Sequence, residues 1–177
     1  MNRIVLCLDI DDCLIPASST YFGRFDDTLD IMAANMRRIK AMIEMFDIGV
    51  FITSSWYASL TINEDKTLGY KREHLVNDED GKPNHIYSSF KLLRDGVGAR
   101  AVGLSCGDRH RDIANLLNDG CKVIAMDDMC LHASKITKQC PDVDAEALAS
   151  NYLFLHVRGF ITNEHTFVAR NFLDKQH

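Results

Sequence analysis

Two aspartates directly follow an apolar run near the start of the chain. The run IVLCL covers residues 4–8, and Asp9 and Asp11 come next, one residue apart. Apolar runs rich in Val and Ile are typical of strands buried on both faces of a parallel sheet, and such sheets bind ligands beyond the carboxyl ends of their strands. The spacing lets both carboxylates lean to one side of an extended chain, where their repulsion needs an offsetting cation. Because hard cations prefer oxygen ligands, we expect a Mg²⁺ site that includes Asp9 and Asp11.

The pattern Asp9-x-Asp11 after a hydrophobic strand resembles motif I of the haloacid dehalogenase-like (HAD) superfamily, whose members are mostly phosphatases and phosphotransferases. The resemblance implies that Asp9 attacks phosphorus and forms an aspartyl-phosphate. It implies that Asp11 protonates the leaving oxygen, then deprotonates the hydrolytic water, and lends its backbone carbonyl to the metal. Asp12 and Cys13 stand where the family usually has Gly and Thr or Val, but neither change removes a reacting group. A strand followed by an Asp-rich turn is the alternative interpretation.

Hydroxyl groups follow the next apolar run. Residues 47–53 end at Thr53, and Ser54, Ser55 and Trp56 come after it. Thr53 fits motif II, whose hydroxyl would bind a nonbridging phosphoryl oxygen. The four residues together resemble the Ser-Ser-Ser-Trp signature of a small HAD branch related to domains of RNA-repair-type proteins. We therefore expect Ser54 and Ser55 to bind substrate, and leave open whether Trp56 packs in the core or stacks on a base.

Two segments offer the acidic metal ligand of motif IV. Asp108 and Asp112 match the GDxxxD form, and Asp127 with Asp128 matches the DD form. The family core has five strands with this motif after the fourth. The DD form fits that count, whereas the other form needs a further strand in residues 57–90, where no suitable apolar run exists. By resemblance, Asp128 then binds Mg²⁺ directly and Asp127 orients water or the motif III cation. Asp108 also suits a helix N-cap, and stays an alternative ligand.

A cation that pairs with the phosphoryl group is expected before the fourth strand. The stretch DRHRDI at residues 108–113 resembles the pattern of the same branch and indicates Arg109, at the start of a predicted helix. Helix N-termini favour anions. Arg111 and Lys91 are rival candidates, and a solvated helix end is the alternative for either arginine.

Strand-like runs alternate with helical periodicity along the chain. Strands are predicted at residues 4–9, 47–53, 100–106, 121–126 and 151–157. Helices are predicted from Asp27, as N-cap, to Ile43, at 85–95, 108–118 and 162–172, with short helices around 59–68 and after Asp142. This alternation predicts an α/β domain with a parallel sheet. The HAD resemblance makes this prediction more specific, because it implies a three-layer Rossmann-like domain with a five-stranded parallel sheet and a minimal cap.

The composition is that of an ordinary globular protein. The chain has 177 residues, which suits one domain over 1–177, with 46% hydrophobic and 25% charged residues. No apolar run is long enough for a membrane span, and the N-terminus lacks the features of a signal peptide, so we expect a cytoplasmic protein. The net charge of −5 argues against a broad nucleic-acid-binding face.

Six cysteines occur without a C-x-x-C pair, and those at 7, 106 and 121 are interpreted as reduced residues in or beside strands. A zinc site of Cys130, His132 and Cys140 is the alternative for the later cysteines. Its spacing matches no common pattern.

These features lead to one functional expectation and its alternatives. We expect a Mg²⁺-dependent phosphohydrolase with an aspartyl-phosphate intermediate and no membrane or obligate protein partner. Its substrate would be a phosphorylated small molecule, such as a nucleoside monophosphate, or a nucleic-acid end, such as a polynucleotide 3′-phosphate. The alternatives are a non-catalytic HAD-like binding or regulatory module, and a phosphotransferase or nucleotidase that acts on a small metabolite.

Overall fold

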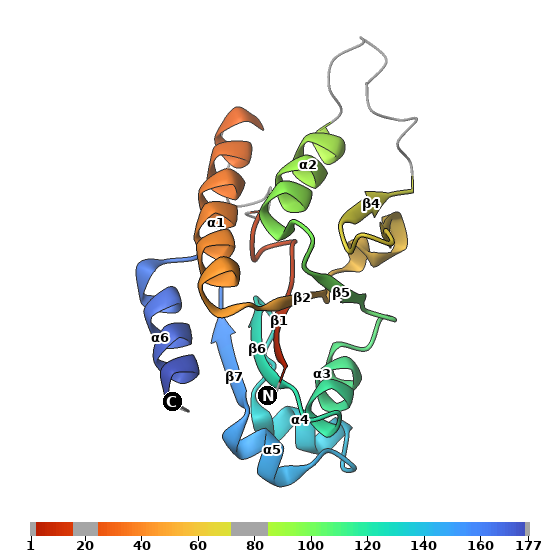
Figure 1. Cartoon of the computed structure of the whole chain (residues 1–177), viewed down its shortest axis with the longest axis vertical. Coiled ribbons are helices and arrows are strands. Elements are labelled where there is room, and N and C mark those ends of the chain that lie inside the picture. Colours follow the sequence, from red (N-terminus) through yellow and green to blue (C-terminus); the bar gives the residue numbers. More distant parts are fainter. Residues whose placement is uncertain (1–2, 16–24, 72–84, 176–177) are drawn as a thin grey trace.

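A five-stranded parallel sheet forms the centre of the molecule (Figure 1). The computed structural model describes residues 3–15, 25–71 and 85–175. The strands of the sheet are β1 (Ile4–Leu8), β2 (Gly49–Ile52), β5 (Ala101–Leu104), β6 (Lys122–Asp127) and β7 (Tyr152–His156). The five strands that the sequence predicts are therefore confirmed, and their ends shift by at most two residues.

The order of the strands reverses the direction of winding at one point of the sheet. The order is β5-β2-β1-β6-β7. Counted along the chain, this is the order of a Rossmann-like sheet, in which the direction of winding reverses beside the first strand. The reversal lies between β1 and β6, and ligands of such sheets bind where the loops from the two strands diverge. Leu8 pairs with Met126 in register, so Asp9 and Asp127 emerge side by side at this point.

Helices cover both faces of the sheet and complete three layers (Figure 1). One face carries α1 (Phe25–Phe46), α2 (His85–Val97) and α6 (Asn163–Asp174), and the other carries α3 (Arg109–Asn118), α4 (Ala133–Gln139) and α5 (Ala145–Ser150). Alternate residues of β1 point to opposite sides. Leu6 and Leu8 pack in the first core, and Val5 and Cys7 pack in the second. Burial on both faces explains why β1 reads as a continuous apolar run.

The helix expected around residues 59–68 is wrong, and a short hairpin lies there instead. The 3-10 helix η1 (Ser55–Ser59) leads into β3 (Leu60–Ile62), which pairs antiparallel with β4 (Leu68–Tyr70). Leu60 and Leu68 are both fully buried. The hairpin forms a separate two-stranded sheet, so it adds no strand to the parallel sheet on which the choice of motif IV depends.

The turn of this hairpin explains why a helix does not form. The Asn63 N–H donates to the Thr67 carbonyl over 2.9 Å, and Asp65 Oδ1 accepts the Thr67 N–H over 3.0 Å. Lys66, between them, has a positive φ of 64°, which an α-helix does not allow. Side chains that bond to nearby backbone groups favour turns over helices, and Asp65 makes such a bond here.

The remaining helices are confirmed except in detail. α1 begins at Phe25, so Asp27 lies within its first turn and is not the N-cap. Asp108 is the N-cap of α3, as expected, and its side chain accepts the Arg111 N–H over 3.1 Å. α5 follows Asp142 as predicted, with Asp144 as N-cap, whereas α4 was not foreseen. Among the described residues, no helix combines the length and apolar character that crossing a bilayer requires.

The cysteines occupy different environments. All six are free, and Cys7 and Cys121 are buried. Cys106 lies two residues beyond the end of β5, so it is beside a strand as expected. Unlike Cys7 and Cys121, it is exposed. Within residues 3–15, 25–71 and 85–175, Cys130, His132 and Cys140 do not form a group spaced for a metal ion. The zinc alternative therefore has no geometric support.

Candidate functional site

Asp9 lies at the centre of the candidate site, on the residue that follows β1. Its N–H donates to the Met126 carbonyl over 3.0 Å, which extends the pairing of β1 with β6. The Asp9 side chain is 1% exposed, and neither carboxylate oxygen accepts a hydrogen bond from a described residue. Buried polar groups are normally hydrogen-bonded, because burial removes their water without replacement. The described chain therefore leaves both oxygens of this buried carboxylate without a hydrogen bond.

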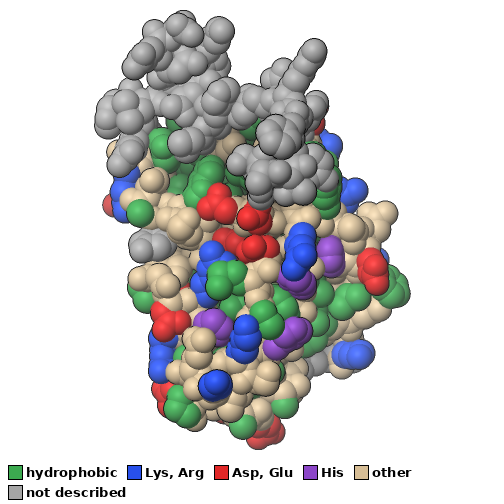
Figure 2. Space-filling model, turned by 180° about the vertical axis from the view of Figure 1, so that it is seen from behind, with side chains coloured by type: hydrophobic (Ala, Val, Ile, Leu, Met, Phe, Trp, Pro, Cys, Tyr) green, Lys and Arg blue, Asp and Glu red, His purple; other side chains and the backbone are tan. Residues whose placement is uncertain are grey.

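Asp127 and Asp128 form a cluster of three carboxylates with Asp9. Asp127 ends β6 and is fully buried, and Asp128 follows it in a half-buried position. One carboxylate oxygen from each residue lies within 4.8 Å of the other two. Figure 2 shows acidic side chains gathered near the centre of one face, with basic and histidine side chains beside them. In the part of the chain that the structure describes, this is the one group of three or more ligands spaced for a metal ion.

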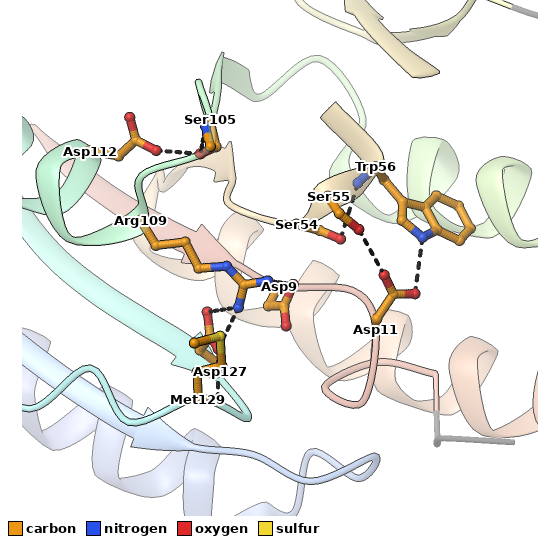
Figure 3. Close-up of polar contacts among 11 residues, drawn as sticks. Asp9, Asp11, Ser54, Ser55, Trp56, Ser105, Arg109, Asp112, Asp127 and Met129 are labelled. Carbon is orange, nitrogen blue, oxygen red and sulfur yellow. Dashed lines mark hydrogen bonds and ion pairs between the residues drawn. The ribbon is translucent and has the colours of Figure 1, made fainter. Parts of the chain in front are cut away.

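Arg109 brings a positive charge into this cluster from the first turn of α3. Its Nη1 lies 2.7 Å from both oxygens of Asp127, and its Nη2 lies 3.2 Å from Asp9 Oδ1 (Figure 3). The contact with Asp9 is an ion pair without hydrogen-bond geometry. The Met129 N–H also donates to Asp127, over 2.8 Å. Asp127 is thus held by Arg109 and Met129, whereas the oxygens of Asp9 stay without hydrogen bonds.

Burial changes the protonation of the two carboxylates. Burial, and next the charge of Asp127, raise the pKa of Asp9 from its ordinary 3.8 to about 7, although Arg109 and the Ile10 N–H act in the opposite direction. Burial also raises the pKa of Asp127, against the lowering effects of the Met129 N–H and of Arg109. Two carboxylates this close do not both ionise easily unless a cation joins them.

Two hydroxyl residues lie at the end of β2, beside β1. The Thr53 N–H donates to the Leu8 carbonyl over 3.0 Å, and Thr53 is 3% exposed. Its hydroxyl oxygen has no hydrogen-bond partner among the described residues. Ser54 is fully buried, and its hydroxyl accepts the Trp56 N–H over 3.4 Å. Thr53 is therefore a second buried polar group that lacks a partner, next to the strand that carries Asp9.

Asp11 lies apart from the carboxylate cluster. Its carboxylate accepts the Ser55 hydroxyl over 3.2 Å and the Trp56 indole N–H over 3.0 Å, and Figure 3 shows it turned toward these two residues. The expectation that Asp9 and Asp11 lean together along an extended strand is wrong, because β1 ends at Leu8. The chain then turns, and Asp12 has a positive φ of 57°. Asp11 itself is exposed, on the rim of the site.

The rival candidates have other contacts. The side chain of Asp108 caps α3, so it faces the helix backbone. Arg111 pairs with Asp142 over 2.7 Å, and Lys91 lies on the exposed surface of α2. Of the three candidate cations, Arg109 is the one that contacts Asp9 in the described structure.

Asn35 is a site-supporting residue that the sequence interpretation missed. It is 1% exposed in the middle of α1. Its amide nitrogen donates to the carbonyls of Leu14 (3.0 Å) and Gly159 (2.9 Å), and its oxygen accepts the Ile161 N–H (2.9 Å). Asn35 thereby joins the loop after Asp9 to the segment after β7. An amide among the apolar positions of a helix is the signal that could have revealed it.

Asp112 is a second supporting residue. It is 7% exposed, and it accepts hydrogen bonds from the Ser105 hydroxyl and, over 3.6 Å, from the Cys106 thiol. The Ser105 hydroxyl in turn accepts the Gly107 N–H over 3.0 Å. These bonds fix the loop between β5 and α3, and therefore the helix start from which Arg109 reaches the cluster. The GDxxxD match drew attention to Asp112, but as part of a metal site and not as a support for this loop.

The site fits Mg²⁺, the ion that the HAD resemblance implies. The cluster offers carboxylate oxygens only, which suit this hard cation. Both oxygens of Asp9 are buried without hydrogen bonds, as expected for atoms whose partner is not part of the chain. Asp9 and Asp128 are the residues with side chains placed to hold the ion, since Asp127 is already bonded to Arg109.

No protein-family model, no curated protein and no solved structure matches this chain.

Proposed function

We propose that the protein is a Mg²⁺-dependent phosphohydrolase of HAD-like type, which cleaves a phosphomonoester through an aspartyl-phosphate on Asp9. One observation carries the proposal. Asp9 is 1% exposed, has no hydrogen bond on either carboxylate oxygen, and lies within 4.8 Å of two further carboxylates at the switch point of the sheet. The HAD-like sequence pattern around Asp9, Thr53 and Asp128 supports the same chemistry.

Each of the chain's own site residues has a separate role in the proposed reaction. Asp9 attacks phosphorus in line with the leaving oxygen. Arg109, which already contacts Asp9, and the unpaired hydroxyl of Thr53 bind the nonbridging oxygens, where negative charge is held in the transition state. Asp127 orients Arg109 through two contacts of 2.7 Å. Positioning and charge stabilisation of this kind account for most of the catalysis in phosphoryl transfer.

Asp9 and Asp128 would hold Mg²⁺ through their side chains, and the HAD resemblance adds the backbone carbonyl of Asp11. When bound, the ion offsets the repulsion among the carboxylates and polarises a phosphoryl oxygen. Asp11 is the proposed general acid and base. Its carboxylate is held by the Ser55 hydroxyl and the Trp56 indole N–H, to which it is bonded over 3.2 and 3.0 Å.

Phosphate release from an aryl phosphate, measured with Mg²⁺ and with EDTA, tests the proposal. We expect release that requires Mg²⁺ and falls by at least roughly 10³-fold in Asp9→Asn, because this change removes the nucleophile and keeps the shape of the side chain. Thr53→Val should lower the rate by about 10²-fold through loss of one donor to the transition state.

Asp108→Asn is the matched control, because asparagine caps a helix as well as aspartate does. It should keep the wild-type rate. Full activity in Asp9→Asn would remove this residue as nucleophile. Loss of activity in Asp108→Asn, with Asp128→Asn unaffected, would assign the metal to the GDxxxD segment. Mg²⁺ binding without any phosphate release would favour the non-catalytic module.

A further inference from the structure

The segment after β7 is fixed tightly against the rim of the carboxylate cluster. The Val157 N–H donates to the Asp127 carbonyl over 3.0 Å, and the Gly159 N–H donates to the Asp12 carbonyl over 2.5 Å. Asn35 bonds to this segment twice more, at 2.9 Å each time. Residues 157–161 are thereby joined to both strands that carry the proposed metal ligands. The backbone of this segment is therefore fixed relative to the site, and so is the point from which each of its side chains extends.

Arg158 is one of these side chains, and its charge is unpaired. It is exposed, and in the described ranges no carboxylate lies within ion-pair distance of it. Its one described contact is between its Nε and His156 Nε2, at 3.4 Å. Arg109 differs, since it is engaged by both Asp9 and Asp127. The two arginines therefore have different availability for an added anion.

His156 does not satisfy Arg158. The His156 Nε2 lies 2.8 Å from the carbonyl oxygen of Asp128. A carbonyl only accepts hydrogen bonds, so this nitrogen carries the proton and cannot accept a second one from Arg158. The guanidinium donors of Arg158 are thus left for another acceptor. His156 also pairs in register with Asp127, so it contacts both Arg158 and the backbone of Asp128, a proposed metal ligand.

The positive charges of the site are used up by its carboxylates, so a second phosphate group would need a further cation. Asp9, Asp127 and Asp128 bring three negative charges when ionised, which Arg109 and one divalent cation together offset. One transferable phosphoryl group uses the donors that remain, Thr53 among them. A substrate with a second phosphate group needs a separate cation at the rim. A guanidinium fits this task because its forked N–H groups match two phosphate oxygens.

We propose that Arg158 binds a second phosphate group of the substrate, next to the phosphomonoester that is cleaved. The inference rests on the proposed function and specifies its substrate class. The second phosphate has two sources. It belongs to a nucleoside bisphosphate, or it is the phosphodiester that precedes the terminal phosphate of an oligonucleotide.

Selectivity between substrates tests the inference. The substrates are p-nitrophenyl phosphate, adenosine 3′,5′-bisphosphate, and a 3′-phosphorylated dinucleotide with either a natural or an uncharged methylphosphonate linkage. In Arg158→Gln, kcat/KM for a two-phosphate substrate, divided by that for p-nitrophenyl phosphate, should fall by about tenfold or more. Arg158→Lys should recover part of this ratio. Arg170→Gln, an exposed arginine of α6, is the matched control and should keep the ratio.

The source of the phosphate follows from which substrate responds. A loss confined to the bisphosphate indicates a nucleotide. A loss for the natural dinucleotide, with none for the methylphosphonate, indicates an oligonucleotide end. An unchanged ratio in Arg158→Gln for every substrate would overturn the inference while the phosphohydrolase proposal stands.

Calorimetric binding keeps the two proposals distinguishable if nothing is hydrolysed. Adenosine 3′,5′-bisphosphate should bind wild-type protein at least about tenfold more tightly than Arg158→Gln protein, and Arg170→Gln should bind like wild type. Equal affinity in the three proteins for the bisphosphate and for the natural 3′-phosphorylated dinucleotide, or no binding of either ligand to any of them, would overturn the anion site independently of catalysis.

Discussion

At the scale of single residues, the site is defined by buried polar groups that the described chain leaves without hydrogen bonds. Asp9 and Thr53 are nearly inaccessible, yet the carboxylate oxygens of Asp9 and the hydroxyl of Thr53 have no hydrogen bond. Arg109 offsets only part of the charge, and burial raises the pKa of Asp9 to about 7. Buried polar groups with such unmet contacts are common where a ligand binds, because the ligand supplies the missing contacts.

The raised pKa of Asp9 predicts how stability depends on pH in metal-free protein. Folded Asp9 holds its proton up to about pH 7, and unfolded Asp9 only to its ordinary value of 3.8. The folded state therefore binds more protons in between, and the free energy of unfolding falls as pH rises through this window. The stabilisation is complete below the unfolded pKa and lost above the folded one, and its upper limit is roughly 4 kcal/mol.

Urea unfolding in EDTA between pH 5 and pH 8 measures this effect as the difference between wild type and Asp9→Asn. The difference isolates Asp9 from the other carboxylates, which titrate in both proteins. We expect wild type to lose stability relative to the variant as pH rises. Parallel curves for the two proteins would show that burial does not shift this group.

Trp56 is predicted to position Asp11. Its indole N–H donates to Asp11 over 3.0 Å. A Trp56→Phe change keeps an aromatic side chain but removes this donor. If Asp11 is the general acid, the loss should be greatest for substrates with poor leaving groups, which depend most on proton donation. We expect kcat for an alkyl phosphate to fall about tenfold and kcat for p-nitrophenyl phosphate to fall less.

Ser55→Ala removes the longer contact of 3.2 Å and should give a smaller loss with the same dependence on leaving group. Equal losses for both substrates in Trp56→Phe would indicate a packing role for the ring, without an effect on Asp11.

At the scale of elements, the site residues lie at strand ends and at the start of a helix, and buried polar contacts hold these ends together. Asp9 directly follows β1, Thr53 directly follows β2, Asp127 ends β6, and α3 begins with Arg109. The loop after β1 and the segment after β7 leave different strands, and the Asn35 amide on α1 connects them. A single buried amide thus fixes two pieces of the rim relative to the helical layer.

Asn35→Leu should destabilise the fold by about 3 kcal/mol or more, because it leaves three buried backbone groups without their partner. These are the carbonyls of Leu14 and Gly159 and the N–H of Ile161. Chemical unfolding measures the change. Asn115→Leu, at an exposed position of α3, is the matched control and should change stability by less than about 0.5 kcal/mol. Similar effects of the two substitutions would show that Asn35 does not link the elements.

At the scale of the whole molecule, the reversal of winding between β1 and β6 brings Asp9, Asp127 and Asp128 together. Asp9 lies more than a hundred positions before Asp127 and Asp128 in the chain. Folding gathers three carboxylates with one arginine, so the folded state should bind a divalent cation that the unfolded chain does not.

Mg²⁺ should therefore raise the melting temperature of wild-type protein. At about 100 times its dissociation constant, a ligand of the folded state adds roughly 2.7 kcal/mol to the stability. For a chain of this size, this corresponds to an increase of about 5 to 10 °C. Asp128→Asn should lose most of the increase and Asp108→Asn should keep it, as thermal unfolding with Mg²⁺ and with EDTA can measure. An equal increase in both variants would place the ion elsewhere.

The sequence by itself determined the parallel sheet and the positions of its strands. Strands buried on both faces must be apolar along their whole length, so β1 and β6 are visible without any knowledge of contacts. The N-cap of α3 is equally local, since Asp108 bonds to a backbone group three residues away. The hairpin at 60–70 escaped prediction because its strands have three residues each, too few for a period to appear.

Only the tertiary structure decided which polar residues meet. The sequence grouped Asp11 with Asp9, but in the folded chain Asp11 bonds to Ser55 and Trp56, about 45 positions along the chain. Likewise, Arg109 and Arg111 look equivalent in sequence, and they differ because α3 directs one to Asp127 and the other to Asp142. Periodicity encodes which face of an element is buried, whereas side-chain partners depend on how separate elements pack, which no local pattern contains.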